Sequence, residues 1–571
     1  MPEWDYTTDA VVVGSGGGGL CGALVARKRG LDVLVLEKAE YIGGSTGMSG
    51  GLVWIPNNPL MRTEGVADSA QDALAYFDTV AGDGGPASSP QRRQAFVTEG
   101  PRLVAFLQGL GLPLRRAGGY PDYHSDVPGG SKQGRNIEAL LFDTHQLGPW
   151  EKKIYAGMFA GIGIVGYATE LSEMLYYNRS PRALLTAARV QARSWAARLR
   201  GKALVANGGA LVGRLLMQAL TMGAEIWTEA PLRALVVEDG AIAGVVVRKD
   251  GRDLRVAARY GVLLAAGGFS RNDDMRARYG GDKATSAALS MANAGDTGEV
   301  LTMAMALGAA TDLMDEAIWV PVMCFPDGSM PAYPARQMGA FSRSRWRAGS
   351  IIVDSSGQRF ANESMSYREL GQLMFARNRE VKAIPSWLVF DDRFRRQCIY
   401  GARPGRMPEQ WITDGFVLRA DSLDELAASC GIHADGLKST VDKFNEYARS
   451  GIDLDFRRGD SAYDQYMGDP RHRPNPCLAP IQQPPFYGVA IYPGDVGTFG
   501  GLLTDDRARV LREDGQPIPG LYAAGNITAA VCGRGYLGAG GSIGPACTFG
   551  FVAMNDLADR AEHRQARRAA G

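Results

Sequence analysis

The chain has 571 residues, of which 45% are hydrophobic and 22% are charged, and its formal net charge is +1. This composition is typical of globular proteins, and the length allows roughly two to four domains. Because basic and acidic residues balance, the sequence provides no overall electrostatic field that would recruit nucleic acid, and we expect no nucleic-acid partner.

The seven cysteines are spread along the chain, and none forms a C-x-x-C pair. An odd number of cysteines without such pairs argues for a reducing compartment and against a metal site or a disulfide framework. No basic and apolar leader precedes the first predicted strand, and no apolar run reaches the roughly 18–20 residues of a membrane span. We therefore expect a cytoplasmic protein that binds no metal.

A dinucleotide-binding pattern occupies residues 9–37, where an apolar run, a glycine-rich turn, a helix of small residues and a second apolar run follow one another. Gly14, Gly16 and Gly19 fit G-x-G-x-x-G. In this pattern the first glycine permits the turn, the second admits a pyrophosphate and the third lets the helix pack on the strand. Glu37 ends the second strand, where an acidic side chain binds ribose hydroxyls. The alternative is a glycine-rich turn that holds no ligand.

Further glycine-rich segments favour a buried flavin over NAD. Residues 41–56 interleave two glycine pairs with hydroxyl side chains and can lie along a nucleotide, although a plain surface loop is the alternative. Residues 260–269 and 520–526 each read as a buried strand that ends in glycine, and residues 532–546 can direct backbone N–H groups and a helix N-terminus at the flavin ring. The residues expected to bind FAD are Gly14, Ser15, Gly16, Gly17, Gly18, Gly19, Glu37, Lys38, Gly43, Gly44, Ser45, Thr46, Ser49, Gly50, Gly51, Ala266, Gly267, Gly525, Asn526, Gly541, Ser542 and Ile543.

The two distant strand-and-glycine signals imply one sheet that is interrupted by an insertion. We predict an α/β fold with an α+β insert. In this fold a Rossmann-like FAD-binding domain comprises residues 1–282 and 487–571, and a catalytic domain that binds the substrate comprises residues 283–486. The charged tail after Asp559 is expected to fray.

An extra segment at residues 146–205 differs in character from the rest. Residues 154–168 carry no charge but are too few to span a membrane, and Pro181 opens a helix with no acidic residue through residue 202. At helical spacing one stripe is basic and another is apolar: Arg182, Arg189, Arg193 and Arg200, and Leu184, Ala188, Ala192, Trp195 and Leu199. This pattern is typical of a membrane-surface element, so residues 150–202 are predicted to bind a membrane surface. A solvated face over an ordinary hairpin and a subunit contact are the alternatives.

The glycine-rich segment near the C-terminus also carries a candidate for chemistry. Few side chains surround Tyr536 there, so packing alone explains this tyrosine poorly. Its hydroxyl and the Gly540 N–H can both face a substrate oxygen, which is the arrangement of an oxyanion-type site.

Two other segments carry candidate tyrosines. Tyr367 follows a G-x-R-F-x-N-E box in which Arg359 and Glu363 can form a structural pair. A turn-rich loop carries Tyr120 and Tyr123, and loops on a rigid scaffold often carry function. On sequence alone, packing is the competing interpretation for these loop tyrosines.

The N-terminal fingerprint, the Asn-Glu-Ser box with its tyrosine and the final glycine-rich loop resemble the FAD-dependent 3-ketosteroid Δ1-dehydrogenases. The wider clan is similar to the flavoprotein fumarate reductases. The resemblance covers nearly the whole chain, apart from residues 146–205 and part of 325–345. It implies a fumarate-reductase-like catalytic domain and 1,2-desaturation of a 3-ketosteroid, in which a base removes the C2 proton and flavin N5 takes the C1 hydride.

The resemblance also implies a role for each tyrosine that matches a family motif. Tyr367 would be the base, Tyr123 its assistant, and Tyr536 with the Gly540 N–H would hold the C3 carbonyl. The chemistry is coherent, because a phenol with a pKa near 10 is a poor base at neutral pH unless a neighbouring hydroxyl stabilises its phenolate.

Two positions depart from the family pattern or leave it open. Leu537 stands where family members often have proline, which predicts a looser loop, and Tyr120 is an alternative assistant for the base.

The extra segment is similar to a subgroup that acts on steroids with a long side chain, such as cholest-4-en-3-one. The implied partners are a 3-ketosteroid, an external electron acceptor of quinone-like or artificial type, and the inner face of the cell membrane.

Competing functions remain at this stage. One is a Δ4-(5α)-ketosteroid dehydrogenase, in which a Tyr-x-Ser pairing stands near the C-terminus, whereas here Leu537 and Gly538 follow Tyr536. Another is a fumarate-reductase-like flavoenzyme, whose dicarboxylate site would need an arginine and histidine cluster that the sequence does not place near Tyr367. The last is a non-catalytic FAD-binding protein of the membrane surface.

Overall fold

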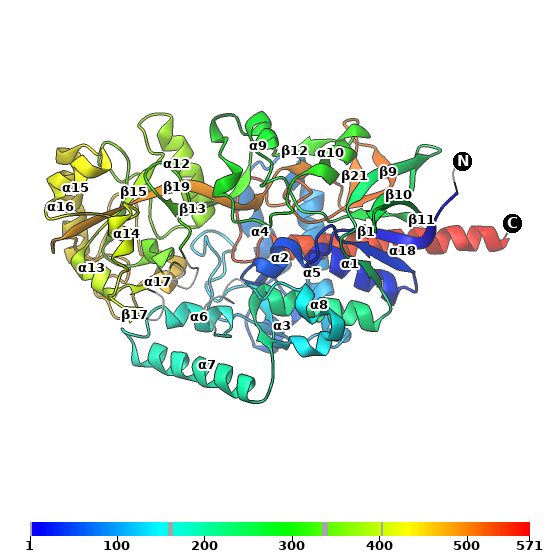
Figure 1. The fold of residues 1–571 in the computed structure, drawn as a ribbon, viewed down its shortest axis with the longest axis horizontal. Coiled ribbons are helices and arrows are strands. Elements are labelled where there is room, and N and C mark those ends of the chain that lie inside the picture. Colours follow the sequence, from blue (N-terminus) through cyan, green and yellow to red (C-terminus); the bar gives the residue numbers. More distant parts are fainter. Residues whose placement is uncertain (1–2, 158–163, 334–337, 339–340, 401–402, 571) are drawn as a thin grey trace.

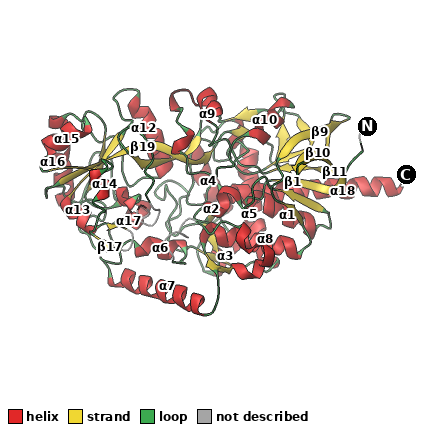
Figure 2. Ribbon diagram, in the orientation of Figure 1, coloured by secondary structure: helices red, strands yellow, loops and turns green. Residues whose placement is uncertain are grey.

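The structure is a computed structural model that describes the whole chain except residues 1–2, 158–163, 334–337, 339–340, 401–402 and 571 and the side chains of residues 567–570. Two sheets lie toward opposite ends of its long axis, with helices packed around each (Figures 1 and 2).

The larger sheet has eight strands and contains both predicted strand-and-glycine signals. Strand β1 (Tyr6–Val13) pairs in parallel with β2 (Val33–Leu36) and with β11 (Arg252–Leu264), and β11 pairs in parallel with β22 (Pro517–Ala523). The end of β11 and the end of β22 are therefore neighbours, as predicted for one interrupted sheet. The remaining strands are β8 (Glu225–Trp227), β9 (Leu232–Glu238), β10 (Ala241–Lys249) and β21 (Arg509–Leu511).

Helices bury this sheet, which explains why its central strands read as unbroken apolar runs. Helix α1 (Gly17–Lys28) packs between α8 (Asn207–Thr221) and α18 (Ile543–Ala570), and α5 (Pro90–Gly109) packs on α18 beside α4 (Ala70–Ala81). The expectation of a frayed tail is wrong, because α18 continues through Ala570. Arg29, which follows α1, pairs with Asp559 at 2.8 Å and with Glu562 at 2.7 Å and so ties this end of α18 to the body.

The smaller sheet is antiparallel and lies within and just after the predicted insertion. Its strands are β13 (Ala317–Cys324), β14 (Ser350–Val353), β15 (Ser386–Asp391), β18 (Leu418–Ala420) and β19 (Phe486–Thr498). Helix α12 (Tyr367–Asn378) packs on β13, and α15 (Leu423–Cys430) packs on α16 (Ala434–Ser450). Strand β19 begins at the predicted boundary and pairs with β13, β15 and β18. The division into domains stays a prediction.

The extra segment leaves the body through a short pair of strands, β6 (Phe142–Asp143) and β7 (Leu204–Val205). Between them run η2 (Thr144–Lys153), α6 (Ala168–Met174) and α7 (Pro181–Leu199), and α7 lies at the lower edge of the molecule in Figure 1. The central part of the uncharged run predicted at 154–168 lies outside the described residues. No helix in the described ranges combines the length and the hydropathy that crossing a bilayer would require.

Several shorter elements complete the fold. They are α2 (Gly44–Met48), α3 (Pro59–Thr63), α9 (Asp273–Gly280), α10 (Glu299–Ala306), α13 (Asp392–Gln397), α14 (Gln410–Thr413), α17 (Ala462–Met467), β3 (Val53–Trp54), β4 (Leu114–Arg116), β5 (Asn136–Ala139), β12 (Thr311–Asp312), β16 (Ile399–Tyr400), β17 (Arg403–Pro404) and β20 (Gly501–Leu502).

Candidate active site

The first glycine motif forms a tight turn between β1 and α1. Gly14 has a φ of +105°, and a Cβ at Gly19 would lie 2.1 Å from the Gly14 carbonyl oxygen, so the third glycine is needed for helix–strand packing. A Cβ at Gly16 would meet only the Thr46 Oγ1 atom, at 3.8 Å. Gly16 also caps α1 without a side-chain hydrogen bond. The Gly17 N–H donates to the Thr46 hydroxyl at 3.1 Å, and the absence of a capping side chain leaves room for an anion at this helix N-terminus.

The acidic residue at the end of β2 links the first two glycine loops. The Glu37 carboxylate is buried and accepts from the Ser15 hydroxyl at 2.5 Å and from the Ala39 N–H at 2.9 Å. The Ser15 hydroxyl in turn accepts from the Gly43 N–H at 3.0 Å. The expected contact between Glu37 and a ribose stays a prediction, but its carboxylate already fixes the turn against the second loop.

The second glycine loop, residues 41–56, is held by residues from the start of the predicted catalytic domain. Ser45 donates to the buried Asp296 carboxylate at 3.0 Å, and Lys38 forms an ion pair with Glu299. Burial raises the pKa of Asp296 to about 7, partly offset by the bond from Ser45. Sequence reasoning missed Asp296, because an isolated aspartate in a loop gives no local signal. A Cβ at Gly44 or Gly50 would meet no protein atom within 4 Å.

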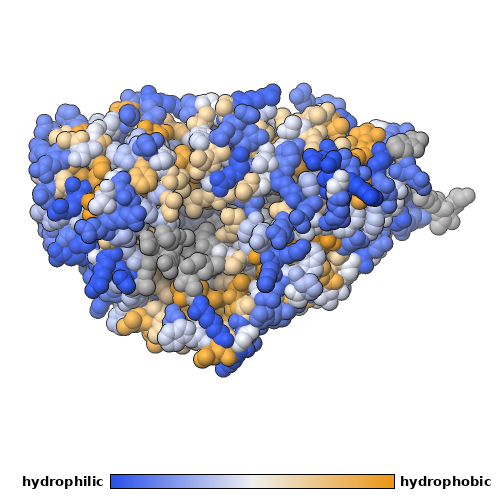
Figure 3. All heavy atoms as spheres, in the orientation of Figure 1, coloured by the Kyte–Doolittle hydropathy of each residue, from blue (hydrophilic) through white to orange (hydrophobic). Residues whose placement is uncertain are grey.

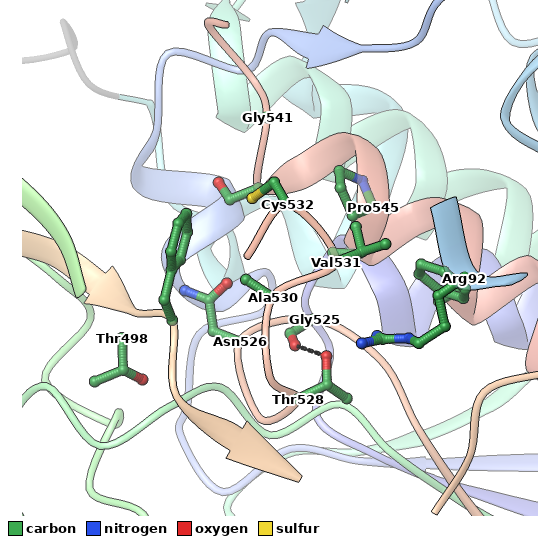
Figure 4. Close-up of a pocket in the computed structure, with 14 residues that line it drawn as sticks. Arg92, Thr498, Gly525, Asn526, Thr528, Ala530, Val531, Cys532, Gly541 and Pro545 are labelled. Atoms are coloured by element: carbon green, nitrogen blue, oxygen red, sulfur yellow. Dashed lines mark hydrogen bonds between the residues drawn. The ribbon is translucent and has the colours of Figure 1, made fainter. Parts of the chain in front are cut away.

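The third part of the expected FAD site lies where α18 begins. Figure 4 shows Gly525, Asn526 and Gly541 around one cavity, with the Arg92 side chain directed toward the turn at Thr528. The Thr528 hydroxyl donates to the Gly525 carbonyl at 2.7 Å and closes this turn. Arg92 is buried at the start of α5, and burial lowers its pKa to about 10. Sequence reasoning did not find Arg92, which the fold brings here from a distant helix.

The three predicted catalytic tyrosines meet in one cluster. The ring centroids of Tyr123 and Tyr367 are 5.5 Å apart, those of Tyr367 and Tyr536 are 5.6 Å apart, and those of Tyr123 and Tyr536 are 5.7 Å apart. Tyr367 is the first residue of α12, whereas the other two lie in loops. The structure therefore brings together residues from three separate segments, although their catalytic roles stay predictions.

Burial governs the acidity of these phenols. It raises the pKa of Tyr123 and of Tyr367 well above the usual value. Neighbouring phenols raise the pKa of Tyr123 further, whereas for Tyr367 the effect of Tyr536 raises the pKa and the hydrogen bond with Tyr123 lowers it. Burial also raises the pKa of Tyr536. A phenol in this cluster becomes a useful base only when neighbouring donors stabilise the negative charge of its phenolate.

The backbone around Gly540 fits the predicted carbonyl site. Gly540 has a φ of +89°, and a Cβ there would lie 2.3 Å from the Leu52 carbonyl oxygen, so a larger residue would displace the loop. Its carbonyl accepts from the Trp54 N–H at 3.2 Å and from the Gly544 N–H at 2.9 Å. Within the described part of the chain, the Gly540 N–H donates to no protein acceptor.

Two further observations bear on the departures from the family pattern. The carbonyl of Leu537 accepts from the Tyr76 hydroxyl at 2.5 Å and from the Tyr123 N–H at 3.4 Å, which anchors the loop where proline is absent. The Tyr120 ring packs on Tyr466 at 4.8 Å, whereas the Tyr123 ring contacts both other tyrosines of the cluster. This geometry favours Tyr123 as the assistant.

The loop that carries Tyr123 is held by a buried carboxylate. Asp122 accepts from the Trp54 Nε1 atom at 2.8 Å, from Arg135 at 2.8 Å and from the Ser131 N–H at 3.0 Å. Burial nevertheless raises the pKa of Asp122. These bonds fix the backbone directly before Tyr123.

A fourth phenol borders the cluster. Tyr463, in α17, has its ring centroid 4.7 Å from that of Tyr123, and its buried hydroxyl has no hydrogen-bond partner among the described residues. It lies in a charge-mixed stretch that gave no motif, so sequence reasoning could not find it. The pairing predicted in the Asn-Glu-Ser box is confirmed, because Arg359 and Glu363 form two contacts of 2.8 Å.

The fold and the glycine loops define a dinucleotide-binding flavoprotein. The family model described as FAD binding domain matches residues 9–543. The 3-oxosteroid 1-dehydrogenase of Mycobacterium tuberculosis is 41% identical, covering 97% of this chain and 99% of that protein. The chain belongs to the FAD-binding family that includes these 3-oxosteroid 1-dehydrogenases.

Two other comparisons agree with this assignment. The crystal structure of 3-ketosteroid Δ1-dehydrogenase from Sterolibacterium denitrificans in complex with 1,4-androstadiene-3,17-dione has a TM-score of 0.89 and 37% identity, covering 97% of this chain and all of that one. The 4-oxocyclohex-2-ene-1-carboxylate 5-dehydrogenase of Sinomonas cyclohexanicum is 34% identical, covering 99% of this chain and 96% of that protein. The expected fold class and cofactor are confirmed.

The residues present fit FAD. The N-terminus of α1 has no capping side chain, a Cβ at Gly16, Gly44 or Gly50 would meet little or no protein, and a cavity lies beside Asn526. These features suit a pyrophosphate and a flat ring system.

Proposed function

We propose that this chain catalyses the FAD-dependent 1,2-desaturation of 3-ketosteroids. The observation that carries the proposal is the cluster of Tyr123, Tyr367 and Tyr536, assembled from three segments of a chain whose relatives are 3-oxosteroid 1-dehydrogenases over nearly their full length. The enzyme is an oxidoreductase that acts on a CH–CH group.

The proposed roles follow from what each group can do. The Tyr536 hydroxyl and the Gly540 N–H bind the C3 carbonyl and stabilise the negative charge that builds on its oxygen, which acidifies the C2 proton. Tyr367 acts as the phenolate, which the Tyr123 hydroxyl stabilises by donating to it, and becomes a neutral phenol when it takes that proton. Bound FAD supplies the acceptor for the two electrons that leave with the C1 hydrogen. As these bonds break, a C1–C2 double bond forms.

The aromatic lining favours a large apolar substrate. The Tyr120 ring lies 4.8 Å from that of Tyr466, the Tyr123 ring lies 4.7 Å from that of Tyr463, and the Phe499 ring lies 5.8 Å from that of Tyr536. Aromatic walls with few polar groups suit a steroid nucleus, for which one carbonyl needs recognition.

Helix α7 supports a peripheral association with membranes. Its small or polar residues Ala183, Thr186, Val190, Ser194 and Ala197 face the protein and are buried. Its larger apolar side chains Leu184, Leu185, Trp195 and Leu199 are between 55% and 88% exposed. Figure 3 shows hydrophobic atoms at the lower edge of the molecule, where α7 lies. An outward apolar face beside arginines is the pattern of an interfacial helix.

We further propose that the substrate keeps a long side chain, as cholest-4-en-3-one does, because such a steroid partitions into lipid. An external acceptor of the quinone class would then reoxidise the cofactor at the same surface. Flotation with phosphatidylcholine and phosphatidylglycerol vesicles tests the association. The variant with Leu184, Leu185, Trp195 and Leu199 changed to Ser should stay at the bottom of the gradient. The matched control changes the equally exposed Ile452 and Leu454 to Ser and should float like the wild type.

A substrate panel tests the activity. The purified flavoprotein is mixed anaerobically with androst-4-ene-3,17-dione, cholest-4-en-3-one or 4-oxocyclohexanecarboxylate. In a separate experiment its flavin is first photoreduced and the protein is then mixed with fumarate. The flavin absorbance and product mass are recorded in each case. Steroid-dependent bleaching with loss of two mass units supports the proposal. Bleaching only by the cyclic keto acid, or reoxidation by fumarate without any steroid reaction, would assign the chain to another branch of the family.

A further inference from the structure

An ion pair joins the segments that carry Tyr123 and Tyr367. His124 follows Tyr123 directly, and Glu369 lies two residues after Tyr367 in the first turn of α12. The His124 Nε2 atom lies 3.3 Å from the Glu369 Oε1 atom. These atoms and Glu369 Oε2 are buried, and none of them makes a hydrogen bond of good geometry among the described residues. The ion pair with His124 acts on the Glu369 carboxylate together with the weaker effects of Arg368 and the Ser366 hydroxyl.

The charge states of the two groups agree with this geometry. Burial alone would lower the pKa of His124, but its interaction with Glu369 raises it. Burial alone would raise the pKa of Glu369, but its interaction with His124 lowers it to about 2. Each group therefore favours the charged form of the other.

The other polar contacts of the two segments join each of them to a different part of the chain. The backbone N–H groups of Tyr123 and His124 are held through Leu537 and Tyr76, on the side of the C-terminal loop. Arg368, between the two active-site residues of α12, pairs with Glu316 at 2.8 Å and also reaches that loop. The His124–Glu369 pair, in contrast, runs directly from one tyrosine segment to the other.

We propose that His124 and Glu369 are positioning residues whose ion pair fixes the edge-to-face contact of Tyr123 with Tyr367. The inference rests on the proposed function, because it concerns the transfer of the C2 proton. Without the pair, the start of α12 and the Tyr123 loop can shift relative to each other. The phenol that takes the proton then loses the hydroxyl that stabilises its phenolate, and a displacement of about 1 Å costs roughly 100-fold in rate.

Single-turnover reduction of the FAD-loaded protein tests this role. The variants are His124→Gln, Glu369→Gln and the double variant, each with bound FAD and melting temperature recorded. The substrates are androst-4-ene-3,17-dione without label, with deuterium at C2, or with deuterium at C1. His145→Gln is the matched control, because His145 pairs with Glu151 at 2.8 Å on the extra segment, far from the tyrosines in the sequence.

We expect each single variant to reduce its flavin about 10- to 100-fold more slowly. The C2-deuterium isotope effect should increase while the C1 effect does not, since proton transfer becomes the slower step. The double variant should be no slower than the worse single variant, and the control should match the wild type. A single variant leaves one buried charge unpaired and can lose FAD for that reason. The double variant leaves no unpaired buried charge, so its rate of flavin reduction then provides the test.

The inference is overturned if the double variant keeps the wild-type rate and C2 isotope effect, or if the two single effects multiply. A wild-type protein that fails to desaturate any steroid would instead overturn the proposed function, so the two failures are distinguishable.

Discussion

The rings of Tyr123 and Tyr367 meet edge to face, with centroids 5.5 Å apart and an interplanar angle of 72°. One ring comes from a loop fixed by the buried Asp122, and the other comes from the first residue of α12. Neither segment could place its phenol alone, because the contact joins residues that are far apart in the sequence. The proposed chemistry depends on this contact.

Tyr367→Phe should remove the proposed base without disturbing the cofactor. The ring is kept, so packing against Tyr123 and Tyr536 is preserved, while the group that takes the proton is lost. We expect steroid-dependent flavin reduction to fall by about 100- to 10,000-fold, the usual worth of a general base. Stopped-flow absorbance measures the rate, and an unchanged FAD content serves as the internal control. A variant that keeps half of the wild-type rate would assign the base to another residue.

Gly16→Val should separate cofactor binding from folding. Its backbone φ is −66°, which any residue adopts, and the added Cβ would meet only Thr46 at 3.8 Å. The variant should therefore fold, yet its side chain would occupy the space in front of the α1 N–H groups. We expect the Kd for FAD to rise about 100-fold or more, given roughly 1.5–3 kcal/mol for each hydrogen bond to a charged group.

The matched control is Gly19→Ala, whose Cβ would lie 2.1 Å from the Gly14 carbonyl oxygen. This change should destabilise the apoprotein by about 1–3 kcal/mol through overpacking. Denaturant unfolding of the apoproteins and fluorescence titration with FAD distinguish the two. Equal FAD affinity in Gly16→Val and the wild type would place the pyrophosphate elsewhere.

Tyr536→Phe and Gly540→Ala should impair the enzyme in different ways. The first removes one hydroxyl from the proposed carbonyl site, and we expect kcat/KM to fall about 100- to 1,000-fold with FAD retained. The second forces a Cβ to within 2.3 Å of the Leu52 carbonyl oxygen at a φ of +89°, so the loop itself should shift and FAD should be lost. Steady-state kinetics with bound-FAD analysis makes the comparison. Full activity in Gly540→Ala would contradict the loop geometry.

The His124–Glu369 pair predicts a pH dependence of stability. The raised pKa of His124 contributes stability that is complete below its usual 6.5 and is lost as pH rises through the folded-state pKa. The lowered pKa of Glu369 contributes stability that is complete above its usual 4.5 and is lost as pH falls toward 2. Asp122 and Asp126 on the same loop act on His124 in the same direction as Glu369.

The difference in free energy of unfolding between the wild type and the double Gln variant should thus be largest between about pH 4.5 and 6.5 and should shrink toward pH 9. Urea unfolding of the FAD-loaded proteins at pH 5.5 and 8.5 measures it. A difference that grows with pH would show that His124 is not the charged partner.

Local patterns predicted the parts of the molecule that local physics determines. The turn at Gly14 to Gly19, the pairing of Arg359 with Glu363 and the helix that Pro181 opens were visible because each depends on neighbours in the sequence. The tyrosine cluster was predicted only through resemblance, since no spacing rule brings Tyr123 to Tyr367.

Other features could not be predicted because they arise from long-range packing. Asp296, Arg92 and Tyr463 reach the site from segments without a motif. Arg29, at the far end of the sequence, pairs with two acidic residues of α18.

The proposed reaction removes one hydrogen each from C1 and C2 of a 3-ketosteroid. The most direct measurement is the product mass from androst-4-ene-3,17-dione labelled with deuterium at C1 or at C2, converted anaerobically by the purified flavoprotein with an artificial electron acceptor. The wild type should give a 1,4-diene that has lost one deuterium from the labelled carbon in each case, and Tyr367→Phe should give no conversion. A product that keeps its label at C1 and C2, or a protein that bleaches with no steroid, would contradict it.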